Sequence, residues 1–393
     1  MFHRATNNNN KKEYQMLETT LRNADLSDLA ELLKNQETQK VDIVAPAGTI
    51  SSENGLIYVD GADAVINEDG VTQTSGIYSP TAIFDEGLAS KLNIPVGYLR
   101  RMRAERIDLY DANVNGWLSG GDEPMDKSFL IRAFSSTSTS DGIARAFLSD
   151  SYKRMDNLDI LTSALMAVRK SDYDVQVESC DLTERNMRVI LTAPEITASA
   201  EVLLQNYRSP FSGAYGKDNP LISAGLVIKN SETGNGAFSI APHFVVQVCN
   251  NGMTMTTDAQ RNVHLGGKLD DGVIRWSAES NEAALKLVQA KTMDCINTFL
   301  DVDYLKRAIN KIEAKSGQPL NGPADKVITK VCKALTFDEE TTAGVLEHFI
   351  KGADATAGGV MQAVTSYAQV LTDPDAATYM EESAFKALEL ASA

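Results

Sequence analysis

Six basic or aromatic residues in the middle of the chain have side chains suited to binding nucleic acid. Lys and Arg neutralise phosphates, and exposed aromatic rings stack on the bases of single strands. The six lie on or beside segments that alternate like β-strands, so a curved sheet would carry them together. We predict a surface for single-stranded DNA; the alternative is an ordinary sheet with its aromatics in the core. The residues are Arg132, Arg145, Tyr152, Lys153, Arg154 and Arg188.

A second basic group follows Pro95 on a predicted helix that runs towards Trp117. Arg100, Arg103 and Arg106 are spaced by three residues, which places them near one helical face. Such a strip could neutralise phosphates. The alternative is an exposed face whose arginines pair with neighbouring acids such as Glu105 and Asp108.

Catalytic and metal-binding patterns are weak. The sequence contains no H-E-x-x-H, G-x-S-x-G or Walker A motif, and its four histidines are scattered. We therefore predict no metal, no cofactor and no catalytic residue. Carboxylate pairs can hold Mg²⁺ with help from elsewhere, which leaves a magnesium-dependent nucleic-acid enzyme as an alternative. The pairs are Asp172/Asp174, Asp301/Asp303 and Asp373/Asp375.

The charge balance limits where nucleic acid could bind. The chain has 37 Lys and Arg against 53 Asp and Glu, a net charge of −16. Residues 201–300 are close to neutral and residues 351–393 carry a net charge of −4. Nucleic-acid-binding proteins usually have a basic face, so we expect DNA over the middle of the chain and not over the acidic tail. The acidic flanks are equally typical of a plain solubilising surface.

Hydropathy and cysteine usage indicate the compartment. No apolar run approaches the roughly 20 residues that a membrane span needs. The beginning of the chain lacks the apolar stretch of a secretory signal. The four cysteines are widely spaced, which favours reduced thiols in a cytoplasm over a disulfide framework.

The elements that would position these residues form four regions. Residues 1–12 are polar and rich in Asn, which predicts a disordered lead. Residues 13–122 combine helical periodicity with short strand-like runs and form a mixed N-terminal region. Residues 123–280 are predicted to be an antiparallel α+β core, and residues 281–393 a helical C-terminal region.

Within the core, the pattern from residue 128 to residue 193 predicts the order β-β-α-β-β. Asp141-Gly142 marks a hairpin turn between the first two strands, and Asp156 or Asn157 caps the helix. Doubly wound parallel sheets alternate single strands and helices, so this order favours an antiparallel α+β fold. A long helix from Asn281 to about Lys315 is predicted to follow further strands.

Six short segments, in this order, resemble the phage- and plasmid-like proteins of domain-of-unknown-function family 932. The resemblance covers roughly residues 80–380. It implies a bacteriophage or mobile-element origin, and hence the host cytoplasm, but it supplies no activity. The segments are NIPVGYL at 93–99, NVNGWL at 113–118, FLSDSYK at 147–153, NSETG at 230–234, VCNNGM at 248–253 and AVTSY at 363–367.

These observations lead to two hypotheses. The first is a non-enzymatic phage protein that binds or anneals single-stranded DNA as a homo-oligomer. Its order of elements is comparable to that of recombinational annealing proteins, a small antiparallel sheet backed by a long helix. The second is a structural or interaction protein that assembles with itself and binds no nucleic acid, which suits the negative charge.

Overall fold

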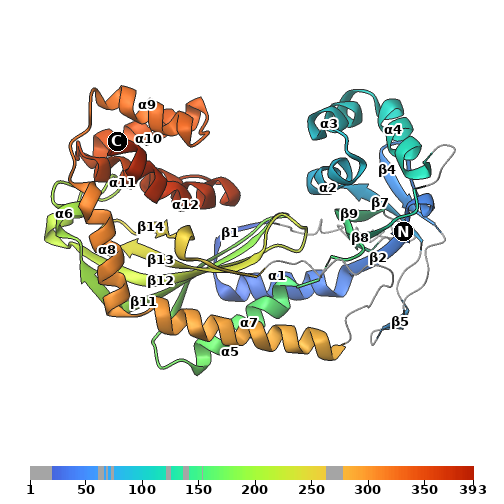
Figure 1. Ribbon diagram of the computed structural model, residues 1–393, viewed down its shortest axis with the longest axis horizontal. Coiled ribbons are helices and arrows are strands. Elements are labelled where there is room, and N and C mark those ends of the chain that lie inside the picture. The colour runs from blue at the N-terminus through green and yellow to red at the C-terminus, as the bar shows by residue number, and fades with distance from the viewer. Residues whose placement is uncertain are drawn as a thin grey trace, which may run out of the picture.

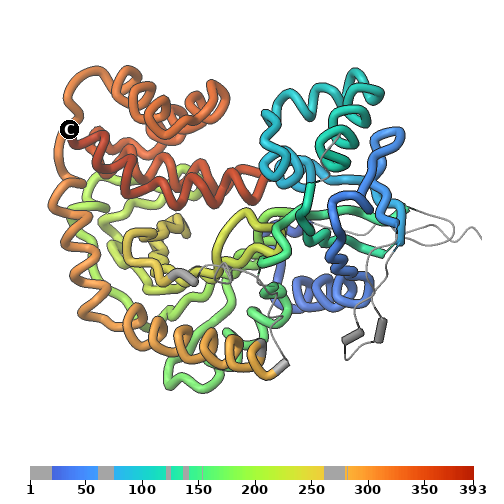
Figure 2. Tube along the Cα trace, turned by 45° about the vertical axis from the view of Figure 1, so that its right-hand side comes forward, coloured from blue at the N-terminus to red at the C-terminus, as the bar shows by residue number. Residues whose placement is uncertain are grey.

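A computed structural model describes residues 20–60, 66–67, 70–71, 75–120, 125–135, 141–152, 154–262 and 278–393. These residues form the predicted α+β fold, with two large sheets and a helical C-terminal region (Figure 1). The helices α2–α4 stand at one end and α9–α12 at the other, on the same side of the sheets (Figures 1 and 2).

Sheet I has the strand order β2-β8-β9-β7-β4-β3. Its pairs are antiparallel except for the parallel pair β7–β9, because α2–α4 lie between these strands in the chain. Its strands are β2 (Lys40–Pro46), β3 (Ile50–Glu53), β4 (Leu56–Val59), β7 (Gly76–Pro80), β8 (Ser128–Phe134) and β9 (Gly142–Ser149). A short 3-10 turn, η1 (Ala47–Thr49), precedes β3, and a separate hairpin joins β5 (Ile66–Asn67) to β6 (Gly70–Val71).

Three helices cover sheet I: α2 (Ala82–Leu92), α3 (Val96–Glu105) and α4 (Ile107–Ser119). The hydroxyl of Thr81 accepts a hydrogen bond from the Phe84 amide and so caps α2. These helices bury Leu99 and Met102 of α3 and Tyr110 of α4 in the core that they share with sheet I. The single helix predicted after Pro95 is thus two helices, because the backbone at Arg106 leaves the helical conformation.

Sheet II has the order β1-β10-β11-β12-β13-β14, and β15 also pairs with β13. All of its pairs are antiparallel. Leu191, Ala224 and Phe244 share one face, which helices following the sheet cover. The strands are β1 (Leu21–Ala24), β10 (Gln176–Leu182), β11 (Met187–Ser199), β12 (Leu221–Asn230), β13 (Phe238–Val246), β14 (Asn251–Thr254) and β15 (Gln260–Asn262).

Helices lie along sheet II, with α5 and α7 packed together beneath it (Figure 1). They are α1 (Leu26–Gln39), α5 (Asn157–Lys170), α6 (Glu201–Leu204), α7 (Ala278–Phe299) and α8 (Val302–Ser316), with the 3-10 turns η2 (Gly216–Asp218) and η3 (Thr256–Asp258). The predicted long helix from 281 to about 315 is therefore interrupted. The chain breaks at Leu300, and the Asp301 carboxylate caps α8 by accepting from the Tyr304 amide.

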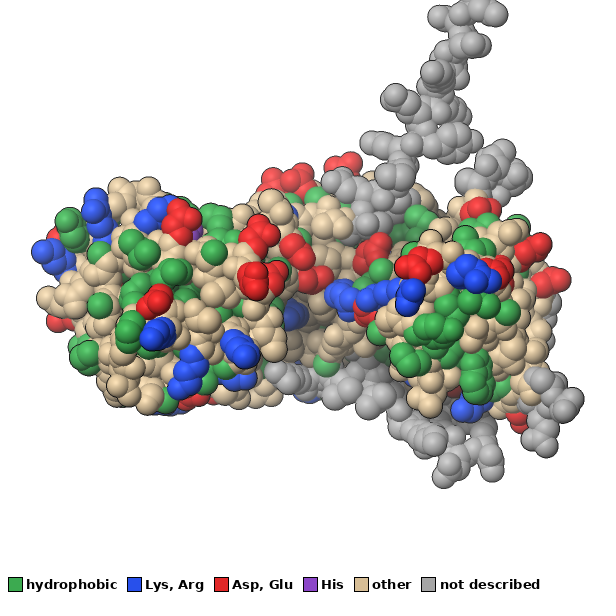
Figure 3. Space-filling model, turned by 90° about the horizontal axis from the view of Figure 1, so that it is seen from above, with side chains coloured by type: hydrophobic (Ala, Val, Ile, Leu, Met, Phe, Trp, Pro, Cys, Tyr) green, Lys and Arg blue, Asp and Glu red, His purple; other side chains and the backbone are tan. Residues whose placement is uncertain are grey.

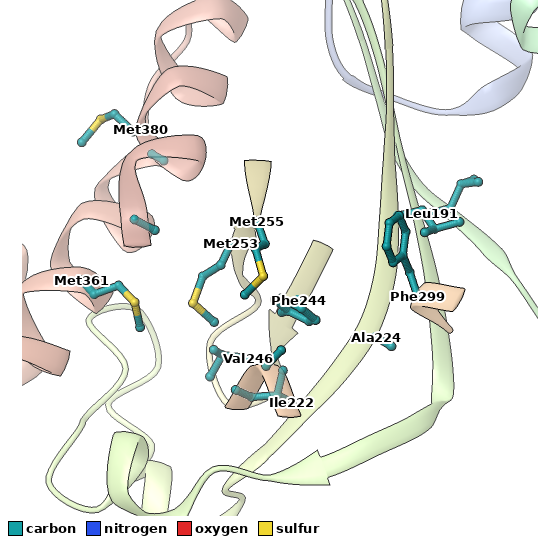
Figure 4. Close-up of a cluster of buried hydrophobic side chains, with 14 of the residues drawn as sticks. Leu191, Ile222, Ala224, Phe244, Val246, Met253, Met255, Phe299, Met361 and Met380 are labelled. Carbon is teal, nitrogen blue, oxygen red and sulfur yellow. The ribbon is translucent and has the colours of Figure 1, made fainter. Parts of the chain in front are cut away.

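The C-terminal helices pack on each other and on the edge strand β14. Met361 of α11 and Met380 of α12 join Met253 and Phe244 in one buried cluster (Figure 4). Pro374 is the first residue of α12, a position whose N–H has no partner within the helix, so the missing N–H of proline costs no hydrogen bond. The helices are α9 (Ala324–Ala334), α10 (Glu339–Gly352), α11 (Ala357–Ala368) and α12 (Pro374–Ala391).

The structure alters the predicted arrangement of the core. The order β-β-α-β-β is correct along the chain, but its two hairpins belong to different sheets: β8–β9 to sheet I and β10–β11 to sheet II. Sheet I also takes β2, β3, β4 and β7 from the predicted N-terminal region, so the sheet crosses the boundary predicted at residue 122. The predicted lead, 1–12, lies outside the described residues.

None of the helices that the described residues form is both long and apolar enough to span a membrane.

Candidate nucleic-acid interface

Arg132 is at the junction of the two sheets, and its exposed fraction is 0%. It faces Asp42 across the β2–β8 ladder and donates to it from Nε at 2.9 Å. Its Nη2 donates to Asp156, just before α5, at 2.5 Å. Burial opposes the charged form, but these two carboxylates outweigh it and raise the pKa of Arg132. The guanidinium is therefore held inside the molecule and does not face phosphate.

Arg145 is held in the same junction. The β8–β9 register shifts beside it, and a bulge of this kind turns a side chain out of the regular alternation. Its Nη1 donates to Oε2 of Glu232 at 2.9 Å, and its guanidinium lies 4.5 Å from the centroid of the Phe134 ring. Glu232 belongs to the β12–β13 loop, so this ion pair ties sheet I to sheet II.

The junction is electrically balanced. Lys40 donates to Asp156 at 2.5 Å and adds a third cation beside Arg132 and Arg145. Three carboxylates, those of Asp42, Asp156 and Glu232, face them. At the edge of the cluster Arg154 also pairs with Asp42 and Glu37 with Lys40, and these two added charges cancel. A balanced buried cluster serves as a structural joint, and it leaves no net positive charge to attract an anionic strand.

Arg188 is ion-paired in a second buried cluster. It faces Asp181 across the β10–β11 ladder at 3.4 Å, and it also pairs with Glu381 of α12. Burial opposes its charged form, but Glu381 and Asp181 raise the pKa of Arg188. All three arginines, Arg132, Arg145 and Arg188, are buried and ion-paired. The prediction that they bind phosphate on a sheet surface is therefore corrected.

The other three predicted residues have different outcomes. The Tyr152 ring packs beside Leu130 and Leu148, and its hydroxyl donates to the Ser231 carbonyl at 3.2 Å. Burial raises the pKa of Tyr152 to about 12, and its partly buried ring offers less surface to a stacking base than an exposed ring would. Lys153 lies outside the described residues. Arg154 has a 54% exposed side chain and lies 3.4 Å from Asp42, so it stays a predicted DNA contact.

The arginines of α3, and Arg106 directly after it, are paired with acids, as the alternative interpretation of this segment expected. Arg103 binds Asp85 at 2.7 Å, Arg106 binds Asp108 at 2.5 Å, and Arg100 pairs with Glu86. These pairs cancel the positive charge of the strip.

The carboxylate pairs offer no metal site where they are described. Asp301 caps α8, and Asp373 caps α12 by accepting from the Asp375 amide at 2.9 Å. Among the residues that the structure describes, no three His, Cys, Asp or Glu side chains are grouped to hold a metal ion.

Exposed cations instead gather on α8 and α9, where the sequence analysis did not place them. Residues 302–334 contain seven Lys or Arg and three Asp or Glu, a net charge of +4 in a chain of −16. A charge count in windows of about 30 residues would have found this stretch. Six of the cations are exposed and lie within 4.0 Å of no described carboxylate oxygen: Lys306, Arg307, Lys311, Lys326, Lys330 and Lys333.

These cations lie on helical faces opposite the core. In α9, Lys326, Lys330 and Lys333 follow the spacing of one helical face, while Ile328 and Val331 are buried. Figure 3 views this end of the molecule from above and shows Lys and Arg spread over it, whereas acidic side chains collect over the middle.

A small hairpin beside α6 carries exposed aromatic rings. Arg208 and Tyr215 form an antiparallel bridge, and the Ser209 amide donates to the Ala214 carbonyl at 2.8 Å. Gly213 closes the turn with a φ of +73°, a conformation that Gly adopts without strain. Gly216 passes so close to α6 that an added Cβ would lie 2.6 Å from the Leu204 carbonyl oxygen. The hairpin is therefore firmly seated.

Tyr215 is the central side chain of this hairpin and is 50% exposed. The Arg208 guanidinium lies 5.6 Å from the ring centroid and the Lys217 ammonium 5.3 Å from it. Neither cation has an ion pair with a described carboxylate. Phe211, also 50% exposed, meets His348 edge-on at 5.7 Å. The hairpin thus combines accessible rings with unpaired positive charge.

The hairpin and the basic helices share one end of the molecule. The Glu313 carboxylate of α8 accepts from the Val202 amide of α6 at 2.7 Å, which fixes α6 on α8. The chain runs from α6 directly into the hairpin, and α9 lies at the same end (Figure 1).

A polar hollow of about 330 Å³ opens nearby on sheet II. Its polar side chains are hydroxyls and amides together with the carboxylate of Glu178, two apolar residues complete the lining, and no cation is among them, so it is a poor site for phosphate. It is lined by Glu178, Thr192, Pro194, Asn219, Ser223, Val245, Gln247 and Asn250.

No protein-family model, curated protein or solved structure matches this chain. The resemblance to domain-of-unknown-function family 932 therefore stays a prediction, as does the phage or mobile-element origin that it implies. Two of the segments that carry it have structural roles, since NSETG forms the loop of Glu232 and VCNNGM the turn between β13 and β14.

Proposed function

We propose that this protein binds single-stranded nucleic acid, without catalysing a reaction, at the end formed by the hairpin and the helices α8 and α9. The observation that carries the proposal is the half-exposed Tyr215 ring between the unpaired cations Arg208 and Lys217. Bases stack on such a ring, and the flanking charges bind the phosphates on either side of the stacked base.

The charge distribution supports this location. The stretch 302–334 is positive, and its exposed cations extend the positive surface beyond the hairpin. In contrast, the arginines of sheet I and sheet II are neutralised in buried pairs. A strand would thus be attracted to one end of an otherwise acidic molecule, and the attraction would weaken as salt screens it.

The test is fluorescence anisotropy with a labelled oligothymidylate in about 50 mM salt, a concentration at which phosphate contacts are strong. Tyr215→Ala should weaken binding by roughly 1–3 kcal/mol, about 5- to 150-fold, because it removes one stacking ring. Tyr215→Phe keeps the ring and should bind like the unaltered protein.

The cations have their own test. Lys217→Ala should flatten the salt dependence by about 0.7 log unit per log unit of salt, the share of one phosphate contact on a single strand. The matched control is Lys286→Ala, which removes an exposed lysine of α7 that is paired with Glu282. Absence of any binding in low salt would overturn the proposal and leave self-assembly as the function.

A further inference from the structure

The polar hollow on sheet II lies where β11 leaves its regular pairing. The ladder between β11 and β12 is interrupted between Ala193 and Thr197, so residues 194–196 bulge out of it. Bulges are frequent beside functional sites, because they bend the strand and turn side chains in new directions. Pro194, the first residue of this bulge, lines the hollow. The irregularity of β11 therefore helps to shape the site.

Two buried hydroxyl groups belong to the lining of the hollow. Thr192 and Ser223 are 4% and 6% exposed. The Ser223 oxygen accepts from the Gln247 side-chain amide at 2.8 Å, but the Ser223 hydroxyl hydrogen has no acceptor among the described residues. The Thr192 hydroxyl donates to Glu178 over a long 3.4 Å. Because hydroxyls this buried normally have hydrogen-bond partners, the hollow offers unused polar groups to a ligand.

The remaining polar groups of the lining indicate the chemistry of that ligand. Glu178 is exposed, and the side chains of Asn219 and Asn250 bond to no described residue. The two oxygens of a carboxylate can accept from two parallel N–H donors of one planar group. The volume, about 330 Å³, is at the small end of ligand sites, which span roughly 300–1,000 Å³. The hollow thus suits one small ring system with N–H donors.

The hollow is also close to the Tyr215 ring along the chain. Asn219, which lines it, follows Tyr215 by four residues, so their Cα atoms are at most about 14 Å apart even in an extended chain. The turn η2 shortens this path, and within it the Asp218 amide donates to the Tyr215 carbonyl at 3.1 Å. A strand with one base stacked on Tyr215 would thus bring a neighbouring nucleotide to the hollow.

We propose that the hollow binds a guanine base of the strand, turned out of the stack, with Glu178 accepting from its N1–H and its N2 amino group. This inference rests on the proposed binding of single-stranded nucleic acid and adds a base preference to it. Unstacked bases of single strands are commonly recognised by hydrogen bonds to their Watson–Crick edges. Guanine is the base that presents two adjacent N–H donors on that edge. The phosphates would stay outside the hollow, where Arg208 and Lys217 lie.

The first experiment compares three strands by fluorescence anisotropy in about 50 mM salt, where phosphate contacts are strong. They are an oligothymidylate and the same strand with every third thymine replaced by guanine or by adenine. The guanine strand should bind about 5- to 150-fold more tightly than the adenine strand, the range for a bidentate contact to one base. Adenine controls for the stacking of a purine ring, because it lacks the pair of donors. Hypoxanthine, which lacks the N2 amino group, should reduce the preference.

Glu178→Gln tests the carboxylate. The change keeps the size of the side chain but leaves one acceptor oxygen, so the preference for guanine over adenine should be lost while oligothymidylate still binds. The matched control is Glu195→Gln, which alters an exposed carboxylate of the same bulge outside the lining and should keep the preference. Each variant removes one negative charge, so the general attraction of the strand changes alike in both.

The outcomes separate this inference from the function on which it rests. Equal binding of the guanine and adenine strands, with oligothymidylate also bound, would overturn the base site and leave the proposed function intact. A guanine preference that persists in Glu178→Gln would place the base elsewhere and likewise overturn it. If no strand binds in low salt, the proposed function is wrong and the base site is wrong with it.

The second experiment locates the base. Irradiation of a bound strand that carries one 6-thioguanine should cross-link it to the segments that line the hollow, 192–194, 219–223 and 245–250. Cross-links confined to the hairpin, residues 208–215, would overturn the assignment. A guanidinium group also has two parallel N–H donors. Binding of an arginine-rich peptide to the unaltered chain but not to Glu178→Gln, without any guanine preference, would therefore assign the hollow to a protein partner instead.

Discussion

Arg132 of β8 donates a hydrogen bond to Asp156, the residue before α5, and this contact joins sheet I to the core beneath sheet II. Asp156 occupies the N-cap position of α5, yet its side chain makes no capping bond. Both of its oxygens are engaged elsewhere, one by Arg132 and one by Lys40. Glu232 accepts from the Asn157 amide in its place, at 2.7 Å. The first amide of α5 is thus bonded by a carboxylate from the β12–β13 loop of sheet II.

Replacing Arg132 should destabilise the fold strongly. Arg132→Met leaves the partly buried carboxylates of Asp42 and Asp156 without their main partner, which should lower the free energy of unfolding by about 3–5 kcal/mol. The matched control is Arg154→Met, because Arg154 also pairs with Asp42 but is 54% exposed. That change should remain within about 0.5 kcal/mol, as for most surface substitutions. Urea titrations of both variants measure the difference, and equal effects would contradict a buried joint.

The same joint should make the protein sensitive to acid. Burial would raise the pKa of Asp156, but Arg132 and Lys40 outweigh it and lower the pKa below the ordinary value. A carboxyl group whose pKa is lower in the folded protein than in the unfolded chain stabilises the fold. This stabilisation is complete above the pKa of the unfolded chain, about 3.9, and is lost as the pH falls through the pKa of the folded protein.

We therefore expect the stability difference between the unaltered protein and Asp156→Asn to be largest near neutral pH and to shrink below about pH 4. Denaturant titrations over a pH series measure it. A difference that stays constant as the pH falls would show that the charge of Asp156 contributes nothing to the joint.

The sequence predicted the α+β class and most elements, because hydrophobic periodicity and capping residues are local signals. It did not predict how strands are shared between sheets. Sheet I needs β2 to pair with β8 and β7 to pair with β9 across three intervening helices, and no local pattern specifies these pairings. The stretch from 281 to 315 was predicted as one helix because its apolar spacing continues across Leu300, but the structure divides it there, and Asp301 caps the second helix.

The candidate interface was harder to predict because exposure depends on tertiary contacts. Arg132, Arg188 and Tyr152 lie on or beside strands in a pattern that suits a charged surface, but their partners are distant in the chain. Glu381 follows Arg188 by 193 residues, for example. Tyr215 and Lys217 lie in a short stretch with Gly213 and Gly216, and only the fold shows that the Tyr215 ring is exposed beside Arg208 and Lys217.

Removing α12 should unfold the protein. Met380 and Leu388 are buried in the core, and Glu381 is a partner of the buried Arg188. A chain ending at Asp373 would expose that core and leave an unpaired buried cation, so we expect no cooperative melting transition. The control is Glu382→Gln, which removes only a partly exposed pair with Lys229 and should change stability little. A truncated chain that melts cooperatively at the same temperature would contradict this role of α12.

The last prediction separates the two possible locations of a nucleic-acid strand. If the strand lies on the helical end, replacing Lys326, Lys330 and Lys333 by Gln should flatten the salt dependence of binding by up to about 2 log units per log unit of salt, roughly 0.7 for each contact. Arg154→Gln should leave the dependence unchanged, because Arg154 lies at the junction of the sheets. Anisotropy titrations at several salt concentrations measure both slopes. The opposite result, a flattened slope for Arg154→Gln and an unchanged one for the triple variant, would return the interface to the sheet residues that the sequence favours.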